Sequence, residues 1–161
     1  MFQLRIILHP TDFSDHSQYA LEVAADLARQ HGATLLVLHV VESLGAENAT
    51  YGEIVSQREP ESYRRRLDED LRRSVPAPAG VAIRYLVTAG EPAQEIERVA
   101  REQTCDLIVM GTHGRAGLNR LLMGSSAERV IRIAPCPVLT TKLPTTASEN
   151  GVSTTARAEL V

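Results

Sequence analysis

The sequence predicts an α/β fold in which a parallel sheet is covered by helices on both faces. Short, fully apolar segments alternate with longer segments whose apolar residues recur at helical spacing. This strand–helix order occurs four times, and one closing strand follows. Strands that are apolar on both sides are typical of a parallel sheet buried between two helical layers. We therefore expect right-handed crossovers between successive strands.

Five segments are predicted as strands because each is short, apolar and bounded by turn-forming residues. They are Arg5–His9, Thr34–Val41, Val81–Val87, Asp106–Met110 and Val138–Thr141. Residues 42–59, between the second strand and the second helix, are polar and contain two glycines. This stretch is predicted as a loop with at most a turn of helix.

Four helices are predicted between these strands. The first is capped by Ser14 or Asp15 and ends at Gly32, where glycine is favoured after a helix. Its inward stripe is formed by Ala20, Ala24, Leu27 and Ala28. The other helices are Glu61–Ser74, a segment opened by Gly90-Glu91-Pro92, and Ser126–Ala134. In the second helix, Arg64–Arg66 is followed directly by Asp68–Asp70, which favours a solvated, ion-paired face over a phosphate-binding patch.

Composition excludes several classes of protein. The 161 residues contain 17 Lys+Arg and 20 Asp+Glu, and the net charge of −3 supplies no field that attracts nucleic acid or an anionic membrane. No apolar run is long enough to span a bilayer, and no signal peptide is indicated. Residues 1–142 are predicted to form one domain, and residues 143–161 are predicted to be a polar tail. With only two cysteines, a cytoplasmic protein with reduced thiols is expected.

A glycine-rich segment follows the fourth strand, and it favours anion binding. It comprises Gly111, Thr112, His113, Gly114, Arg115 and Gly117, followed by Gly124, Ser125 and Ser126. Glycines after a strand are interpreted as positions where a ligand approaches the backbone rather than as packing requirements. The second cluster begins a helix, whose free N–H groups and dipole attract phosphate. The alternative is structural, because Ser125–Glu128 also has the form of a capping box.

Known phosphate-binding signatures do not match this segment. The chain contains no Gly-Lys pair, which excludes a Walker A loop. The spacing G-x-x-G-x-x-G also differs from the dinucleotide G-x-G-x-x-G pattern. Arg115 and Arg120 are cations that either meet phosphate charge or are solvated loop residues.

Asp12 follows the first strand, within the segment Pro10–Ser14. Ligands of open α/β sheets bind beyond the carboxyl ends of the strands, at the point where strand order reverses. There a carboxylate accepts from a ribose hydroxyl or holds a metal ion. The alternative is that Asp12 or Ser14 only caps the next helix. If the first and fourth strands are neighbours, Asp12 and the glycine-rich segment face one crevice.

Taken together, these motifs resemble the universal stress protein family. The likeness covers about residues 4–142 and rests on Pro10–Ser14, Leu38-His39-Val40, the pattern G-x2-G-x9-G-[ST] that begins at Gly111, and Pro135–Leu139. It resembles the ATP-binding branch of the family. The resemblance implies a Rossmann-like, five-stranded sheet in the order 3-2-1-4-5. It also implies that adenine and ribose contact Pro10, Thr11, Asp12 and the Val40 backbone. Ribose and phosphates would contact Gly111, Thr112, His113, Gly114, Arg115, Gly124, Ser125 and Ser126, with Mg²⁺ or Mn²⁺ on the phosphates near Asp12.

The function expected from this resemblance is an ATP-binding stress-response regulator, a nucleotide-dependent switch or sensor that acts through protein clients. ATP, ADP and AMP remain open as the nucleotide. One alternative is a slow metal-dependent ATP hydrolase in which Asp12 positions water; another is a dimeric interaction module with a vestigial nucleotide site. No protein ligand set for a metal is visible among the five histidines, and His39 is predicted to be structural. His113 either faces the ligand or faces solvent.

The fifth strand predicts a homodimer. In the implied order, Val138, Leu139, Thr140 and Thr141 form an edge strand that no charged residue guards. Antiparallel pairing with a second copy across a two-fold axis would satisfy that edge. The alternative is that the tail covers it in a monomer. Cys105 and Cys136 open the fourth and fifth strands, so they are either two unrelated reduced thiols or a pair within disulfide reach under oxidation.

Overall fold

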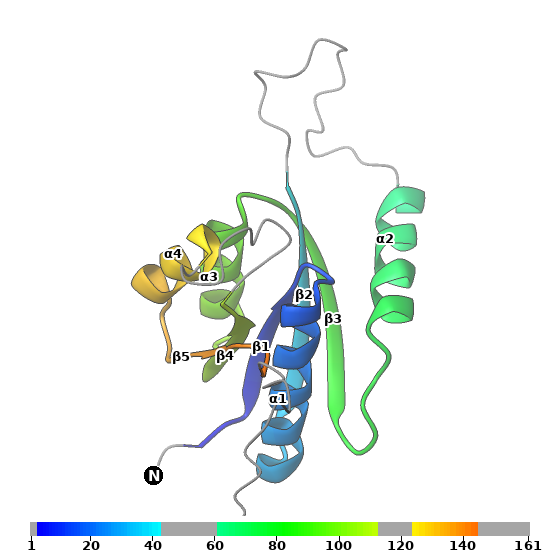
Figure 1. The fold of residues 1–161 in the computed structure, drawn as a ribbon. Helices are drawn as coiled ribbons and strands as arrows, with labels where there is room; N and C mark the ends of the chain where they lie inside the picture. Colours follow the sequence, from blue (N-terminus) through cyan, green and yellow to red (C-terminus); the bar gives the residue numbers. More distant parts are fainter. Residues whose placement is uncertain (1–2, 43–60, 113–123, 145–161) are drawn as a thin grey trace, which may run out of the picture.

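The computed structural model describes residues 3–42, 61–112 and 124–144. The described chain forms a five-stranded sheet in the order β3-β2-β1-β4-β5, and every pairing is parallel (Figure 1). The strands are β1 (Ile6–Thr11), β2 (Thr34–Glu42), β3 (Ala82–Gly90), β4 (Leu107–Gly111) and β5 (Val138–Thr141). The helices are α1 (Asp15–His31), α2 (Glu61–Ser74), α3 (Pro92–Glu102) and α4 (Ser125–Ile133). The predicted α/β class and strand order are confirmed.

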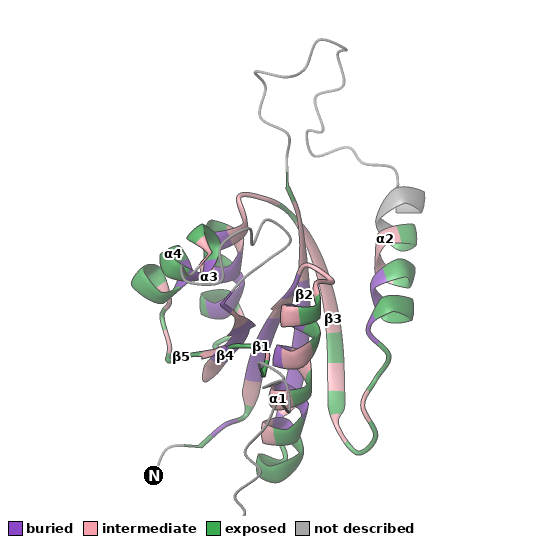
Figure 2. Ribbon diagram, viewed as in Figure 1, coloured by how far each residue is buried: buried purple, intermediate pink, exposed green. Residues whose placement is uncertain are grey.

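Two apolar cores lie on opposite faces of the sheet because successive strand residues point to opposite sides. On one face, Ile7, Leu35 and Val37 pack with α1 and α2 and form the first core. On the other face, Leu8 and Leu36 pack with α3 and α4 and form the second core. Figure 2 shows the buried residues concentrated on the strands and on the inner faces of the helices. The strands are therefore apolar on both sides, as expected for a sheet covered by two helical layers.

Helix ends follow local chemistry that the sequence indicates. Ser14 is the N-cap of α1, and its side chain accepts a hydrogen bond from the Ser17 amide, which decides between Ser14 and Asp15. Gly32 ends α1 with φ 64°, a left-handed conformation that glycine adopts without strain. Glu91 caps α3, whose first residue is Pro92. The third strand extends to Gly90, beyond the predicted Val87, because it pairs with β2 along its whole length.

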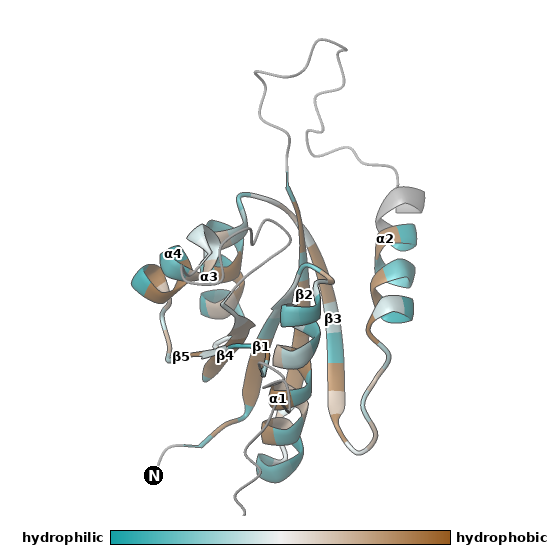
Figure 3. Ribbon diagram, in the orientation of Figure 1, coloured by the Kyte–Doolittle hydropathy of each residue, from teal (hydrophilic) through white to brown (hydrophobic). Residues whose placement is uncertain are grey.

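The described outer face of α2 is polar, and the cations that pair with Asp68 and Asp70 are Arg72 and Arg73; the pairing expected of Arg64–Arg66 stays a prediction. Arg72 lies 2.7 Å from Asp68, and Arg73 lies 3.2 Å from Asp70. Leu71 is the buried residue that attaches this helix to the first core. Figure 3 shows the hydrophilic outer side of α2 and the hydrophobic strands. None of the helices in the described part of the chain is long and apolar enough to cross a membrane.

Pairing along the sheet is uneven. The β2–β3 ladder runs from Thr34–Ala82 to Glu42–Gly90, whereas the register between β1 and β4 pairs only Ile7 with Leu107 and Leu8 with Ile108. The two central strands thus end their ladder before their carboxyl ends. This is the point where strand order reverses, and it is where a ligand crevice is expected in such sheets.

Candidate functional site

The carboxyl ends of β1 and β4 bring together the two segments that the sequence singles out. Strands β1 and β4 are neighbours in the sheet. Thr11 ends β1 and precedes Asp12, and Gly111 ends β4 and precedes Thr112. The condition for a shared crevice was that the first and fourth strands are neighbours, and the sheet meets it.

The turn after β1 is held by the carboxylate of Asp12. Its Oδ1 accepts a hydrogen bond from the Ser14 amide at 3.0 Å and another from the Ser14 hydroxyl at 2.6 Å. Phe13, between them, has φ 63°, which is uncommon for a residue with a side chain. Asp12 thus braces the turn, and Ser14 provides the cap. Backbone strain of this kind persists where surrounding contacts fix it.

Two histidines support this turn from the sheet. The Nδ1 of His39 lies 2.9 Å from the carbonyl oxygen of Thr11, and its ring lies 4.6 Å from the Phe13 ring. This confirms the structural role predicted for His39. His9 is fully buried, and its Nδ1 lies 2.9 Å from the Val109 carbonyl oxygen, which joins β1 to β4 beyond their ladder.

The imidazole of His9 is kept neutral by its surroundings. Burial lowers its pKa from 6.5 to about 4, against the opposing effects of the Val109 carbonyl and the Asp12 carboxylate. A neutral ring that donates from Nδ1 to Val109 has an acceptor at Nε2, and the hydroxyl of Ser17 lies 3.5 Å from it. The single hydroxyl proton of Ser17 is donated to Thr11 Oγ1 at 2.9 Å, the shorter of the two contacts. The role of His9 was not predictable from the sequence, because its Val109 partner lies 100 residues away in the chain.

The two ends of the glycine-rich segment lie side by side. The Gly124 amide donates to the Thr112 carbonyl oxygen at 2.8 Å, and the Thr112 amide donates to the Thr141 carbonyl oxygen at 3.0 Å. The start of α4 is thereby attached to the carboxyl ends of β4 and β5. Residues His113, Gly114, Arg115, Gly117 and Arg120 fall outside the described residues.

The interpretation that these glycines are not needed for packing is wrong for Gly111. A Cβ built on Gly111 would lie 3.0 Å from the backbone carbon and oxygen of His16, in the first turn of α1. Gly111 is therefore required by packing between β4 and α1, which the sequence interpretation had excluded. Its glycine is not evidence of ligand approach.

At the start of α4 the capping-box alternative is also wrong. The N-cap is Gly124, one residue earlier than a capping box would place it, and no side chain caps the helix. The first-turn amides of Ser125 and Ser126 therefore donate no hydrogen bond to a cap side chain. Because unsatisfied amides and the helix dipole give this end a partial positive charge, it suits an anion.

Pro10 and Val40 flank the same end of the sheet. Pro10 lies in β1, in register with Leu38 of β2, and Val40 lies two residues further along β2. Val40 is half-buried and packs against the second core, on the face covered by α3 and α4. Within the described ranges, no group of three His, Cys, Asp or Glu side chains could hold a metal ion.

Comparison with known proteins agrees with this geometry. The family model of the universal stress proteins matches residues 3–142. The chain belongs to the universal stress protein family. A universal stress protein of Methanocaldococcus jannaschii is 38% identical over 143 residues, which cover 86% of this chain and 82% of that protein.

Solved structures of other universal stress proteins share the fold. UspA from Lactobacillus plantarum superposes with a TM-score of 0.66 at 25% identity and covers 87% of this chain and 99% of its own. The universal stress protein from Archaeoglobus fulgidus, solved in complex with dAMP, has a TM-score of 0.54 at 24% identity. That structure covers 88% of this chain and 100% of its own.

Proposed function

We propose that this universal stress protein binds an adenine nucleotide in the crevice outside the carboxyl ends of β1 and β4. The observation that carries the proposal is the hydrogen bond between Gly124 and Thr112. It attaches the start of α4, which no side chain caps, to the residue after β4 at the point where strand order reverses, so the positive end of the helix dipole lies beside the expected ligand site.

The proposed contacts follow from the residues at that end of the sheet. Pro10, Thr11, Asp12 and the backbone of Val40 are assigned to adenine and ribose. Gly111, Thr112, Gly124, Ser125 and Ser126 are assigned to ribose and phosphates, together with His113, Gly114 and Arg115 of the segment outside the described residues. The dAMP complex of the universal stress protein from Archaeoglobus fulgidus supports the class of ligand, because that protein has the same fold and binds an adenine nucleotide. ATP is the nucleotide that we propose, with ADP and AMP as the alternatives to be measured.

A divalent cation, Mg²⁺ or Mn²⁺, is proposed to accompany the phosphates near Asp12. Such ions prefer oxygen ligands, and they are commonly held by one or two carboxylates together with phosphate oxygens. Asp12 fits that role because its carboxylate stands at the end of β1, in the turn that its own Oδ1 braces. When bound, the cation would neutralise phosphate charge.

Binding, rather than hydrolysis, is the activity that the turn favours. Oδ1 of Asp12 already accepts two hydrogen bonds from Ser14, so the carboxylate serves the fold of the turn. We therefore propose a regulator in the cytoplasm, whose nucleotide occupancy changes how it engages protein clients. This regulator is tested against two alternatives. One is a slow metal-dependent ATP hydrolase, and the other is an interaction module with a vestigial nucleotide site.

A homodimer through β5 is proposed as the functional form. The strand is at the edge of the sheet, and Leu139 on it is 38% exposed. Ile131 and Ile133 of α4, which packs beside β5, are 44% and 37% exposed. Large apolar side chains that gather along an unpaired edge favour burial against a second copy.

Calorimetric titration of ATP into the wild type and into Gly124→Ala, with and without Mg²⁺, tests the proposal. Gly124 has φ −61°, a conformation open to alanine, so the added methyl group acts by obstructing the phosphates rather than by straining the backbone. ATP affinity should fall by at least about tenfold. The matched control is Gly32→Asn at the far end of α1, which should bind as the wild type does.

Three results would contradict the proposal in different ways. An affinity of Gly124→Ala within about twofold of the wild type would remove the phosphate assignment. A wild type that binds no adenine nucleotide would favour the interaction module. Release of inorganic phosphate during the titration would favour the hydrolase.

A further inference from the structure

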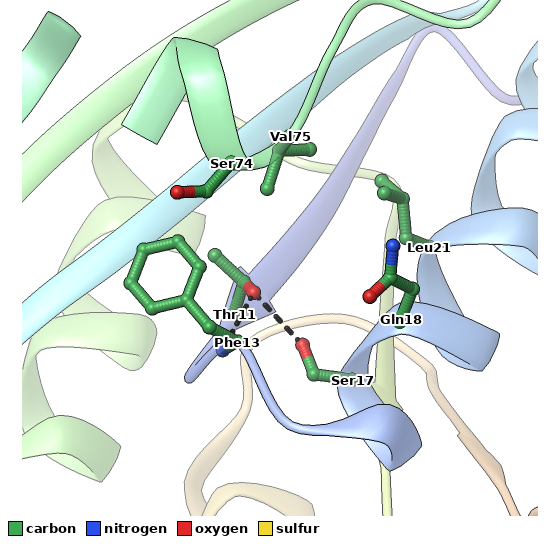
Figure 4. Close-up of a pocket in the computed structure, with 7 residues that line it drawn as sticks. All are labelled: Thr11, Phe13, Ser17, Gln18, Leu21, Ser74 and Val75. Atoms are coloured by element: carbon green, nitrogen blue, oxygen red, sulfur yellow. Dashed lines mark hydrogen bonds between the residues drawn. The ribbon is translucent and has the colours of Figure 1, made fainter. Parts of the chain in front are cut away.

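A cavity lies on the face of the sheet that α1 and α2 cover, and it shares Thr11 with the proposed nucleotide contacts. It has a volume of about 170 Å³ and is enclosed by the turn after β1, the first two turns of α1 and the end of α2 (Figure 4). Its apolar walls, Phe13, Leu21 and Val75, pack with the first core. Val40, by contrast, packs with the second core, so the cavity lies on the other face of the sheet from Val40.

The floor of the cavity is polar and buried. Thr11 is 8% exposed and Ser17 is 4% exposed. The Thr11 Oγ1 accepts hydrogen bonds from the Ser17 hydroxyl at 2.9 Å and from the Phe13 amide at 3.2 Å. Because both acceptor positions of this hydroxyl are occupied, it can bind a molecule in the cavity by donating its own proton.

The mouth is formed by Gln18 and Ser74, which are both exposed. Figure 4 shows the two side chains on opposite sides of Thr11, with Ser74 next to Val75 and Gln18 next to Leu21. All seven lining side chains are uncharged. A charged ligand would lose its hydration here without gaining an ionic partner, so the cavity selects neutral molecules.

We propose that this cavity binds a neutral, single-ring molecule that carries one hydroxyl group, of the size and chemistry of phenol. Its volume suits one ring, since an engineered apolar cavity of about 150 Å³ holds benzene. The ring packs between Phe13, Leu21 and Val75, and the ligand oxygen accepts the proton of Thr11. Binding pockets of this kind combine apolar walls with a few placed polar groups.

Phenol titrated into ¹⁵N-labelled full-length protein and followed by amide chemical shifts tests this proposal. We expect saturable shifts at Phe13, Ser17 and Leu21, and no saturable shifts with the charged rings benzoate and anilinium. Benzene should bind more weakly than phenol, because it leaves Thr11 without an acceptor. No nucleotide is needed in the sample, but Thr11 belongs to both proposed sites, so the Ser74→Phe variant described next is what assigns the ring to the cavity.

A variant that fills the cavity from its mouth provides the second readout. In Ser74→Phe the new ring occupies the space, and phenol affinity should fall by at least about tenfold, because a close-packed interior leaves no room for a second ring. Arg73→Phe is the matched control: it adds the same ring at the neighbouring exposed position, whose side chain does not line the cavity, and should bind phenol as the wild type does. Both positions are exposed, so the variants should fold, which thermal unfolding will verify. A cavity that holds only water, with no saturable response in the wild type, would overturn the proposal, as would unchanged binding in Ser74→Phe.

Discussion

The Nδ1 of His9 and the carbonyl oxygen of Val109 lie 2.9 Å apart, and this contact joins the two central strands beyond the end of their ladder. The imidazole is fully buried between α1 and the sheet, directly behind the turn that carries Asp12. The proposed nucleotide site is therefore built on a neutral histidine, and its stability should depend on pH.

The first prediction concerns acid stability. Burial lowers the pKa of His9 from 6.5 to about 4 in the folded chain, so below pH 6.5 the unfolded chain binds a proton that the folded chain does not. The free energy of unfolding should fall by about 3 kcal/mol from this residue alone as the pH drops from 7 towards 4. Urea unfolding at several pH values measures this slope.

The variant His9→Asn isolates the contribution of the imidazole. Its amide can donate to the Val109 carbonyl as Nδ1 does, but it does not titrate. We expect a lower stability at pH 7 and a much flatter dependence between pH 6.5 and 4. An equally steep dependence in His9→Asn would show that other groups cause the acid sensitivity.

The second prediction separates Gly111 from Gly124, the two glycines of the glycine-rich segment that lie in the described part of the chain. Gly111→Ala should destabilise the fold by about 1 to 3 kcal/mol, because its methyl group meets the backbone of His16 at 3.0 Å. Gly124→Ala should cost about 0.5 to 1 kcal/mol, since alanine is a poorer N-cap than glycine. Denaturant unfolding of both variants measures the difference, and a stable Gly111→Ala would contradict the packing role.

The third prediction tests Asp12 as brace and as partner of the cation. Asp12→Asn keeps the oxygen that accepts from Ser14, whereas Asp12→Ala loses both hydrogen bonds and about 1 to 2 kcal/mol of stability. Asp12→Asn should weaken ATP binding in Mg²⁺ and leave metal-free binding nearly unchanged. Equal loss under both conditions would place the role of Asp12 on the nucleotide itself.

The fourth prediction concerns the thiols, which are both free in the structure. Burial raises the pKa of Cys105 to about 12, and burial also raises the pKa of Cys136, so at pH 8 very little reactive thiolate is present. Alkylation by iodoacetamide should be slow in the folded protein and fast in guanidinium chloride. Mass spectrometry after diamide treatment then tests the disulfide, and rapid native alkylation would contradict the protected state.

The fifth prediction tests the edge strand. The carbonyls of Pro137 and Thr141 accept hydrogen bonds from the β4 side, so the alternate residue Val138 directs its amide to the free edge of β5. Val138→Pro removes that amide hydrogen and should yield a monomer near 17.6 kDa in sedimentation, whereas the wild type should sediment as a dimer. Ala147→Pro, in the segment predicted to be a tail, is the control and should remain dimeric. A dimer that survives Val138→Pro would assign the interface elsewhere, and a wild-type monomer at every concentration would contradict the dimer.

Local chemistry made much of the fold predictable. Helix α2 and strand β5 have the predicted bounds because breakers and apolar spacing define both, and Ser14 and Pro92 mark helix starts by their own stereochemistry. The reason for Gly111 was not predictable, because the contact that requires it comes from His16, 95 residues earlier in the chain. The burial of His9 against Val109 is equally nonlocal. The nucleotide contacts and the dimer stay predictions, since they concern molecules other than this chain.

The division of the core between two faces has a consequence for synthesis of the protein on the ribosome. Leu8, Leu36 and Leu38 belong to strands made early, but their face is covered by Ile96 and Val99 of α3 and by Val130 of α4. Until those helices leave the exit tunnel, the nascent sheet presents an uncovered apolar surface. The first half of the chain can therefore collapse around α1 but cannot complete its fold. The molecule should depend on chaperones during that interval and should reach the native state only when its carboxyl-terminal half arrives.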